Sequence, residues 1–128
     1  MEPTRTHKKV SDPPAGEEPG WTPVTAALAV GEALRVLEGR WKLLILFQLF
    51  GGNVRRFSEL ERAIPEVTQK MLAQQLRQLE ADGIVRRVVH PEIPPKVEYS
   101  LTVWGQSLCP VLDALLKWSA RREETPEA

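Results

Sequence analysis

The chain has 128 residues, and its 17 lysines and arginines balance its 17 aspartates and glutamates. This length suits a single domain. The balanced charge neither supports nor excludes a nucleic-acid partner, because the local placement of charges decides that. The single cysteine, Cys109, excludes a disulfide within the chain and suits a reducing compartment. The longest apolar run, WKLLILF, is too short to cross a bilayer. We therefore expect a soluble, cytoplasmic protein without a membrane partner.

The two ends of the chain differ in composition from its middle. Residues 1–23 contain five prolines and a mixture of charges. Such a segment buries too little apolar surface to offset the entropy lost on ordering. We expect a disordered tail over residues 1–23, one folded domain over residues 24–121 and a frayed C-terminus over residues 122–128.

Two helical patterns open the folded part. In VTAALAVGEALRVLEG, apolar residues recur at positions 30, 34 and 37, and Gly39 stops the pattern. The following stretch, RWKLLILFQLFGG, is apolar nearly all the way round, which is typical of a buried central helix. Gly51 and Gly52 end this helix.

Two further helices follow, separated by a short turn. The stretch RRFSELERAIP predicts a short helix with Ser58 and Glu61 at capping-box spacing, ended by Pro65. The stretch TQKMLAQQLRQLEADG predicts a second helix that begins at the N-cap Thr68 and closes at Gly83.

The second of these helices has two distinct faces. At 100° per residue, three leucines lie within one narrow arc and four other residues lie on the opposite arc. The leucines are Leu72, Leu76 and Leu79, and the opposite arc holds Lys70, Gln74, Arg77 and Ala81. We expect the leucines in the core and the polar arc at the surface.

The remaining chain predicts a hairpin and a final helix. IVRRVVH and VEYSL read as strands, with Val97, Tyr99 and Leu101 on one face, and PEIPP joins them as a rigid tip. The stretch VWGQSLCPVLDALLKWSARR predicts one helix, in which Pro110 removes a backbone hydrogen bond. Six apolar residues share a side of it: Trp104, Leu108, Val111, Leu112, Leu115 and Trp118.

A short helix, a tight turn and a second helix form a helix-turn-helix, and the hairpin after it is a wing. Glutamine pairs bidentately with adenine, and arginine or lysine with guanine. We predict that the second helix reads bases in the major groove and that other basic residues hold phosphates. The base-reading residues are Gln69, Lys70, Gln74, Arg77 and Gln78, and the phosphate-holding residues are Arg55, Arg56 and Lys96. Thr68, at the start of the helix, is also assigned to the DNA-binding surface.

Several features have a second interpretation. A polar helix face is also typical of a merely solvated surface. Arg86 pairs with Glu98 across the hairpin in one interpretation, and contacts a phosphate, as Arg87 does, in the other. Cys109 is either a small buried hydrophobe or a reactive thiol. Four aromatic residues either pack in the core or line a ligand cavity: Trp41, Phe47, Phe50 and Phe57.

Neither catalysis nor metal binding has support in the sequence. His7 and His90 are isolated, and no cysteine–histidine cluster has the spacing of a zinc site. Glu59 and Glu61 point in different directions on a helix and make a poor acid–base pair. We expect no enzyme activity, no metal and no cofactor.

Several long motifs resemble one known family. LEGRWKLLIL, RRFSELERAIPEVTQKMLAQQLRQLEADGIVRR, PEIPPKVEYSLT and GQSLCPVLDAL resemble the HxlR family of bacterial winged-helix transcriptional regulators, in the same order from about Leu28 to Trp118. The resemblance implies a mainly α fold with a small β-hairpin wing, similar to MarR-type regulators. It also implies a homodimer on double-stranded DNA, with the first and last helices at the dimer interface. Leu34 then joins the six apolar residues of the last helix as a dimerisation residue.

The sequence departs from that family at the site of a sensor thiol. Many members carry Cys-Pro ahead of the first helix, where this chain has Leu28 and Ala29. Three alternatives to a plain DNA-binding regulator stay open: a version gated by a small-molecule effector of unknown chemistry, a redox-responsive version, and a winged helix recruited to bind protein.

Overall fold

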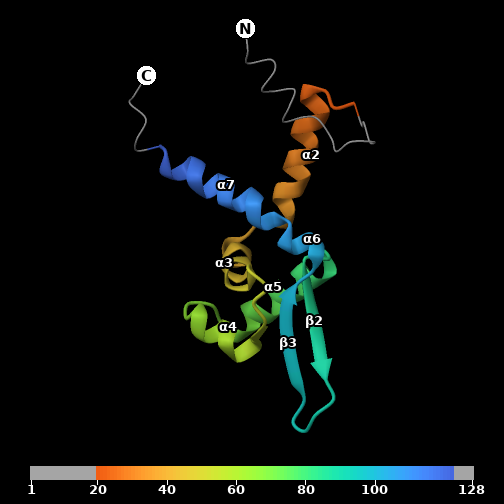
Figure 1. Cartoon of the computed structure of the whole chain (residues 1–128), viewed down its shortest axis with the longest axis vertical. Coiled ribbons are helices and arrows are strands. Elements are labelled where there is room, and N and C mark those ends of the chain that lie inside the picture. The colour runs from red at the N-terminus through yellow and green to blue at the C-terminus, as the bar shows by residue number, and fades with distance from the viewer. Residues whose placement is uncertain (1–19, 123–128) are drawn as a thin grey trace. The chain divides into compact units, whose positions relative to one another are not determined.

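The structure, a computed structural model, describes residues 20–122 and is shown in Figure 1. The chain forms two compact units, residues 1–38 and residues 39–128, and each is described by itself. Most of the predicted tail, the predicted frayed end and His7 lie outside the described residues. The predicted limits of a single domain, residues 24 and 121, stay a prediction.

The first unit contains helix α2 (Pro23–Val36). Thr22 caps it, because the Thr22 hydroxyl accepts a hydrogen bond from the backbone N–H of Thr25 at 3.1 Å. Proline suits the first helical position, where no N–H donor is needed. The helix therefore begins at Pro23, one residue before the predicted start, and Leu37 is its C-cap.

The second unit combines helices with a small sheet. Strand order in the sheet is β1-β3-β2, with both pairings antiparallel. In Figure 1, β2 and β3 extend away from the helices as a narrow ribbon, with α3, α4 and α5 grouped at its base. The elements are α3 (Arg40–Leu49), β1 (Arg55–Arg56), α4 (Phe57–Ala63), α5 (Gln69–Ala81), β2 (Val85–His90), β3 (Lys96–Leu101), α6 (Val103–Gln106) and α7 (Leu108–Ala120).

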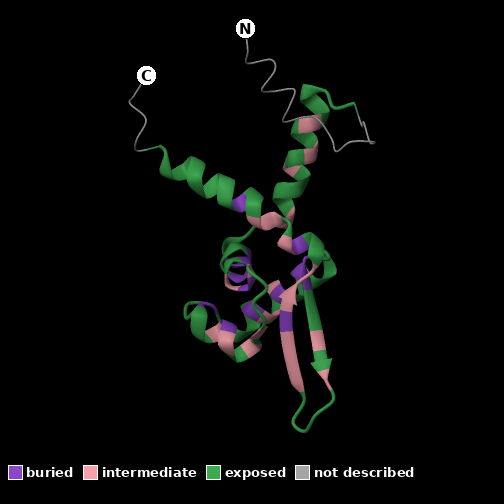
Figure 2. Cartoon of the chain, in the orientation of Figure 1, coloured by how far each residue is buried: buried purple, intermediate pink, exposed green. Residues whose placement is uncertain are grey.

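The core lies where α3, α4 and α5 meet the base of the hairpin (Figure 2). Leu72, Leu76 and Leu79 are at most 1% exposed, which confirms the predicted apolar arc of α5. The other fully buried side chains come from α3, α4 and the start of β2: Ile45, Leu46, Leu49, Leu60, Ile84 and Val85.

Helix α3 is buried on one side only, so its predicted full burial is wrong. Leu43, Leu44 and Phe47 are 39%, 43% and 49% exposed. The elements that pack on α3 within its unit are α4, α5 and β3. They cover one face of a ten-residue helix, which leaves an apolar strip uncovered.

Two local features differ from the prediction around α4. Arg55 and Arg56 form a third strand, β1, which pairs with Tyr99 and Glu98 of β3. A two-residue strand has no period that a sequence pattern can reveal. The capping box of α4 is not the predicted Ser58–Glu61 pair: Arg56, two residues before Ser58, is the N-cap, and its backbone N–H donates to the carboxylate of Glu59 at 2.8 Å.

The last predicted helix is two helices, because the chain turns at Ser107 between α6 and α7. Thr102 caps α6, where its hydroxyl accepts from the backbone N–H of Gly105 at 2.9 Å. Pro110 falls in the first turn of α7, where an N–H has no partner within a helix. The expected loss of a backbone hydrogen bond at Pro110 is therefore wrong.

Candidate nucleic-acid interface

Helices α4 and α5 form a helix-turn-helix. Helix α4 ends at Ala63, as predicted from Pro65, and Val67, 8% exposed, anchors the turn in the core. The hydroxyl of Thr68 accepts from the backbone N–H of Met71 at 3.1 Å, which confirms Thr68 as the N-cap of α5. The cap fixes where α5 begins and therefore which of its residues lie in the first turn.

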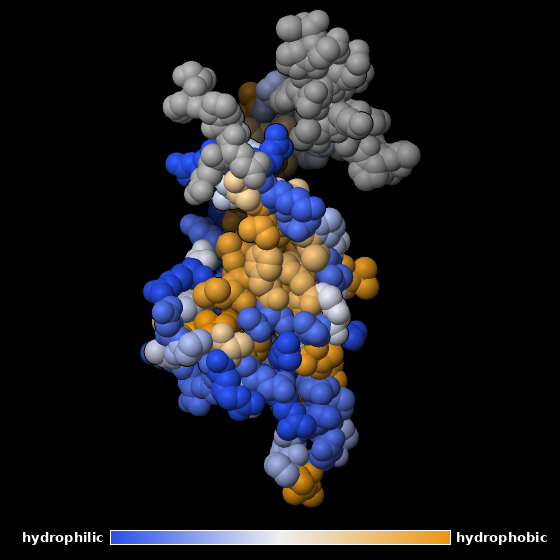
Figure 3. All heavy atoms as spheres, turned by 60° about the vertical axis from the view of Figure 1, so that its left-hand side comes forward, coloured by the Kyte–Doolittle hydropathy of each residue, from blue (hydrophilic) through white to orange (hydrophobic). Residues whose placement is uncertain are grey.

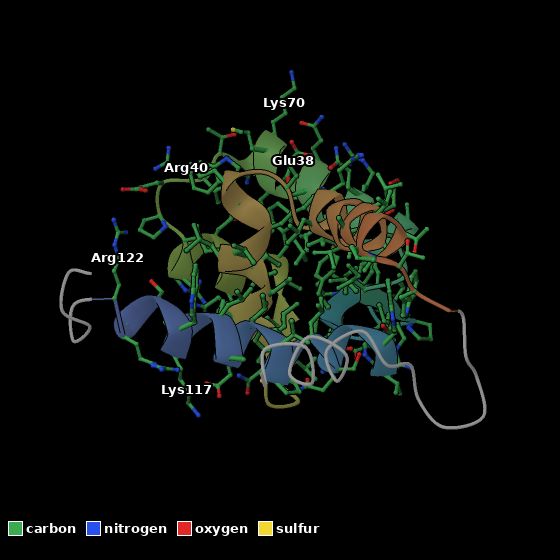
Figure 4. All side chains as sticks on the ribbon, turned by 90° about the horizontal axis from the view of Figure 1, so that it is seen from above. Glu38, Arg40, Lys70, Lys117 and Arg122 are labelled. Carbon is green, nitrogen blue, oxygen red and sulfur yellow. The ribbon has the colours of Figure 1, made fainter. Side chains whose placement is uncertain are left out.

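The predicted polar arc of α5 lies at the surface. The residues of this helix and its cap that are predicted to bind DNA are all exposed: Thr68, Gln69, Lys70, Gln74, Arg77 and Gln78. Figure 4 shows the side chain of Lys70 pointing away from the ribbon. Donors and acceptors on this face are therefore accessible to a partner.

The cations of this surface are not neutralised within the unit. Among residues 20–122, Arg56, Lys70 and Arg77 form no ion pair. The nearby acid Glu66 is paired with Arg40, whose guanidinium nitrogen lies 2.8 Å from the carboxylate. The positive charges thus stay available for an anionic partner.

The sheet places the two arginines of β2 on opposite faces. Arg87 lies opposite Tyr99, and Tyr99 lies opposite Arg55 on its other side, so the three residues form one row across the strands. Arg86 lies opposite Ser100. Side chains alternate along a strand, so Arg86 points to the other face.

The predicted pair between Arg86 and Glu98 is wrong. Glu98 lies opposite Val88, and its carboxylate instead contacts Nε2 of His90 at 2.7 Å and Nζ of Lys96 at 3.5 Å. His90 is therefore not isolated. The hydrogen bond from His90 lowers the pKa of the Glu98 carboxyl, and the charge of Lys96 lowers it further.

The register explains why the sequence pattern did not reveal this cluster. His90 pairs with Lys96 across the hairpin, and Glu98 follows two residues later on the same face. Lys96 begins β3 and is half-buried, so it lies just below the tip instead of at it. The tip carries Ile93, which is fully exposed.

A hollow of about 310 Å³, here the junction hollow, lies where α5 meets the sheet. Leu76 and Tyr99 are its most buried lining residues, at 1% and 9% exposed. Arg77, Glu80 and Arg87 are exposed at its rim. The full lining comprises Ala73, Leu76, Arg77, Glu80, Arg87 and Tyr99. No local sequence pattern reveals this site, because it joins three elements from two parts of the chain.

Arg55 is less accessible than predicted for a phosphate contact. The residue is half-buried, and its Nε donor is buried without a hydrogen-bond partner in the described part of the chain. Arg56, the next residue, is exposed. Of these two predicted phosphate contacts, Arg56 has the more accessible side chain.

The predicted dimerisation residues are mostly exposed. Trp104, Val111, Leu115 and Trp118 are 60%, 53%, 46% and 71% exposed. Leu112 differs, because it is only 6% exposed and packs inside its own unit. Leu108 is half-buried, and Leu34 of α2 is exposed. Figure 3 shows hydrophobic residues gathered in a patch on the face turned to the viewer.

Cys109 and the aromatic residues occupy mixed environments. Cys109 is half-buried in α7, so neither full burial nor free exposure describes it. Trp41 is buried, with the guanidinium of Arg40 lying 4.4 Å from its ring centre. The rings of Phe47 and Phe50 meet edge to face at 5.3 Å. Exposure of Phe47 argues against a closed aromatic core there.

Two further observations bear on other functions. Within residues 20–122, no group of three or more histidine, cysteine, aspartate or glutamate side chains is placed to hold a metal ion. Over the same residues, no helix has the length and apolarity needed to span a membrane.

The fold and this surface together define a class: a winged-helix transcriptional regulator with a helix-turn-helix, in which α5 stands at the position of the recognition helix and the β2–β3 hairpin at that of the wing. The chain belongs to the HxlR-like helix-turn-helix family, whose pattern matches residues 36–126. The resemblance seen in the sequence is thereby confirmed.

Known proteins similar to this chain are regulators. The HTH-type transcriptional regulator YtcD of Bacillus subtilis (strain 168), described as uncharacterized, is 50% identical over 93 residues, 73% of each protein. A MarR-family regulator from Enterococcus faecalis V583 superposes with a TM-score of 0.75 at 35% identity, covering 85% of this chain and 96% of that one. The redox regulator HypR in its reduced form gives a TM-score of 0.68 at 43% identity, covering 73% and 93%. These relatives are described as regulators, not as enzymes.

Proposed function

We propose that the protein is a homodimeric repressor or activator that binds an inverted-repeat DNA operator. Its recognition helix reads base edges in the major groove, and its wing contacts the backbone or the minor groove. The observation that carries the proposal is the exposed outer face of α5, which combines glutamines with unpaired cations directly beside the wing.

Individual roles follow from position along α5. Side chains near the N-terminus of a recognition helix reach base edges. Gln69, Lys70 and Gln74 lie within its first six residues and are assigned to bases, with Thr68 and Gln78 at the margins of the same surface. Phosphate contacts are assigned to Arg56 and Lys96, with Arg55 limited by its burial.

The dimer is supported by the apolar residues left uncovered on α7. Exposed Val111, Leu115 and Trp118 lie on a helix of 13 residues, and large exposed apolar patches mark interaction sites. A two-fold dimer presents two identical recognition helices, which requires two half-sites in opposite orientation. These half-sites should be centred about 34 Å apart, one turn of DNA.

The base-reading assignment is tested with Gln74→Ala and a matched control, Gln75→Ala. Gln74 is exposed at the centre of the outer face, whereas Gln75 is half-buried on the flank near Gly39. The duplex comes from a random-sequence pool enriched by the wild-type protein. We expect Gln74→Ala to lose about 1–3 kcal/mol of discrimination at one base pair per half-site, and Gln75→Ala to retain it.

If the wild-type protein enriches no sequence from the random pool, the proposed sequence-specific DNA binding is wrong. Salt dependence gives a second criterion, because affinity for DNA falls steeply with salt as counterions are released. A partner protein that binds the outer face of α5 with little salt dependence would instead favour a winged helix recruited to bind protein.

This chain has no thiol at the position where many family members carry their sensor cysteine, which argues against a redox response of that kind. HypR is described as a redox regulator, but this chain has Leu28 and Ala29 where many family members carry Cys-Pro. Its single thiol, Cys109, is half-buried in α7.

A further inference from the structure

The junction hollow lies between the two parts that the proposed function brings to DNA. Its lining joins α5, β2 and β3. The two buried residues, Leu76 and Tyr99, leave an apolar base, and the small side chain of Ala73 leaves space beside them. Polar groups stand at the rim. An apolar base with a few polar groups converging at its edge is the usual form of a ligand-binding site, and the sign of the charge at that edge decides which ligands it attracts.

Two guanidinium groups face this hollow from different elements. Arg77 comes from α5 and Arg87 from β2. Neither forms an ion pair among residues 20–122, although the carboxylate of Glu80 lines the same hollow. Two arginines and one glutamate leave a net charge of +1 at the rim. Two positive charges that line the same hollow repel each other, so an anion bound there would be favoured by both.

Tyr99 adds a donor to this arrangement. It stands opposite Arg87 in the sheet, and directly opposite residues share a face. Within residues 20–122, the Tyr99 hydroxyl has no hydrogen-bond partner. A phosphate has several oxygens that can accept from guanidinium and hydroxyl groups, and such charge-assisted bonds are strong.

We propose that Arg77, Arg87 and Tyr99 form a seat for one backbone phosphate of the operator, at the junction of recognition helix and wing. The inference rests on the proposed function, since the phosphate belongs to bound DNA. It reassigns Arg77 from base reading to phosphate binding, gives the phosphate contact expected of Arg87 a defined place, and adds Tyr99 to the interface.

The position of Arg77 along α5 supports that reassignment. Arg77 comes eight residues after Gln69, which places it about 12 Å further along the helix axis. Base edges are reached from the N-terminal part of a recognition helix, whereas the backbone bounds the groove on each side. In the proposed docking, the backbone that bounds the groove would lie at the far part of α5, next to the wing, where the hollow is.

The neighbouring arginine provides a matched control. Arg86 and Arg87 are adjacent, exposed and of the same type, but they point to opposite faces of the sheet. We expect Arg87→Ala to weaken binding about ten-fold on every duplex alike, and to reduce the slope of log affinity against log salt by about one. A seat on the face of Arg87 turns Arg86 away from the DNA, which decides against the phosphate contact considered for Arg86 in the sequence. Arg86→Ala should therefore change neither quantity. Urea unfolding of both variants shows whether the fold is retained.

Neutral linkages locate the phosphate. A series of duplexes, each with one methylphosphonate in place of a phosphate, is titrated with wild type and with Arg87→Ala. We expect one position per half-site at which the substitution weakens the wild type clearly more than it weakens Arg87→Ala, because Arg87→Ala has already lost one contact to that phosphate. Arg77→Ala should show the same reduced effect at that position, and Tyr99→Phe a smaller reduction.

The outcomes separate this inference from the function it rests on. Suppose that the wild type binds its selected duplex, and that Arg87→Ala and Arg86→Ala have the same affinity and salt dependence. The proposed phosphate seat is then wrong, and the DNA-binding function stands. If Arg77→Ala relaxes the preference at one base pair instead of weakening all duplexes alike, the reassignment is wrong. Titration with inorganic phosphate, followed by amide NMR shifts, tests whether the hollow binds a free anion instead of DNA. If phosphate saturates the hollow but does not compete with DNA binding, the proposal is overturned.

Removing the charge of Glu80 tests the proposed phosphate seat independently. Its carboxylate stands at the rim of the hollow and repels a phosphate. Glu80→Gln keeps the shape of the side chain and removes its charge, so we expect tighter binding to all duplexes, by roughly three-fold or more. Affinity that falls in Glu80→Gln would contradict a phosphate in the hollow.

Discussion

Gly105 of α6 lies directly against the backbone of Ile84: a Cβ atom at position 105 would overlap the carbonyl oxygen of Ile84. The same carbonyl accepts from the backbone N–H of Thr102 at 3.0 Å, while the Thr102 hydroxyl donates to the neighbouring carbonyl of Gly83 at 2.7 Å. Ile84 precedes β2 and is fully buried. This close approach joins α6 to the point where the recognition helix gives way to the wing.

Replacing Gly105 by alanine should therefore destabilise the protein. We expect a loss of about 1–3 kcal/mol, because the backbone of Ile84 has to move to admit the methyl group. Urea unfolding measures the change. Gly31→Ala is the matched control, since Gly31 lies within helix α2 and a methyl group added there would meet open space. It should be neutral or stabilise by about 0.5–1 kcal/mol. Equal stability of Gly105→Ala and the wild type would contradict the packing described here.

The N-cap of the recognition helix offers a second prediction. Thr68→Ala removes the acceptor for the backbone N–H of Met71, and we expect a loss of about 1 kcal/mol in unfolding free energy. Thr68→Ser keeps the hydroxyl and should restore most of it. Hydrogen exchange of the first-turn amides of α5 reports the local effect. Unchanged exchange in Thr68→Ala would mean that the cap contributes nothing in solution.

The contacts of Glu98 with His90 and Lys96 in the wing predict that stability depends on pH. The folded protein lowers the pKa of Glu98 below its ordinary value of 4.5, chiefly through the hydrogen bond from His90. A carboxyl with a lowered folded pKa stabilises the fold above its unfolded pKa, and loses that contribution as the pH falls through the folded value. Glu98→Gln should therefore melt at a lower temperature than the wild type near neutral pH.

The difference between the two melting temperatures should shrink as the pH falls below 4.5. Glu92→Gln, a control at the exposed hairpin connection with no ion pair among residues 20–122, should melt as the wild type does. A Glu98→Gln difference that stays constant from neutral to acid pH would show that the ionised carboxylate is not the stabilising species.

Self-association through α7 is the fourth prediction. Leu115→Arg places a charge within the exposed apolar residues of that helix, and we expect self-association to weaken about ten-fold or more. Sedimentation velocity measures it. Lys117→Ala serves as the control, because Lys117 pairs with Asp113 on the exposed side of α7 and its side chain points away from the ribbon in Figure 4. A Leu115→Arg protein that sediments as the wild type does would place the dimer interface elsewhere.

Several features followed from local sequence alone, because their physical cause lies within one or two helical turns. The spacing of Leu72, Leu76 and Leu79 determines which face of α5 is buried, and that same spacing leaves Gln74 outside. Thr68 caps its own helix through a bond three residues away. The family assignment also rested on contiguous motifs, and the match over residues 36–126 confirms it.

Other features depend on residues far apart in the chain. Strand β1 exists because β3, more than 40 residues later, pairs with Arg55 and Arg56. The uncovered apolar strip of α3 depends on which elements pack against it. The turn at Ser107 follows from capping and close packing at Thr102 and Gly105, which a single helical period does not reveal.

Arg86 and Arg87 of β2 show which features the sequence determines and which require the tertiary structure. Alternation along a strand determines from sequence that Arg86 and Arg87 point to opposite faces. Only the antiparallel register with β3 decides that Arg87 stands beside Tyr99, and only the packing of α5 on the sheet brings Arg77 to the same hollow. Local sequence determined that residues 69–81 form a helix with a polar face. Contacts between distant segments decided that Arg77 and Arg87 line one hollow, because the packing of the backbone sets which side chains come together.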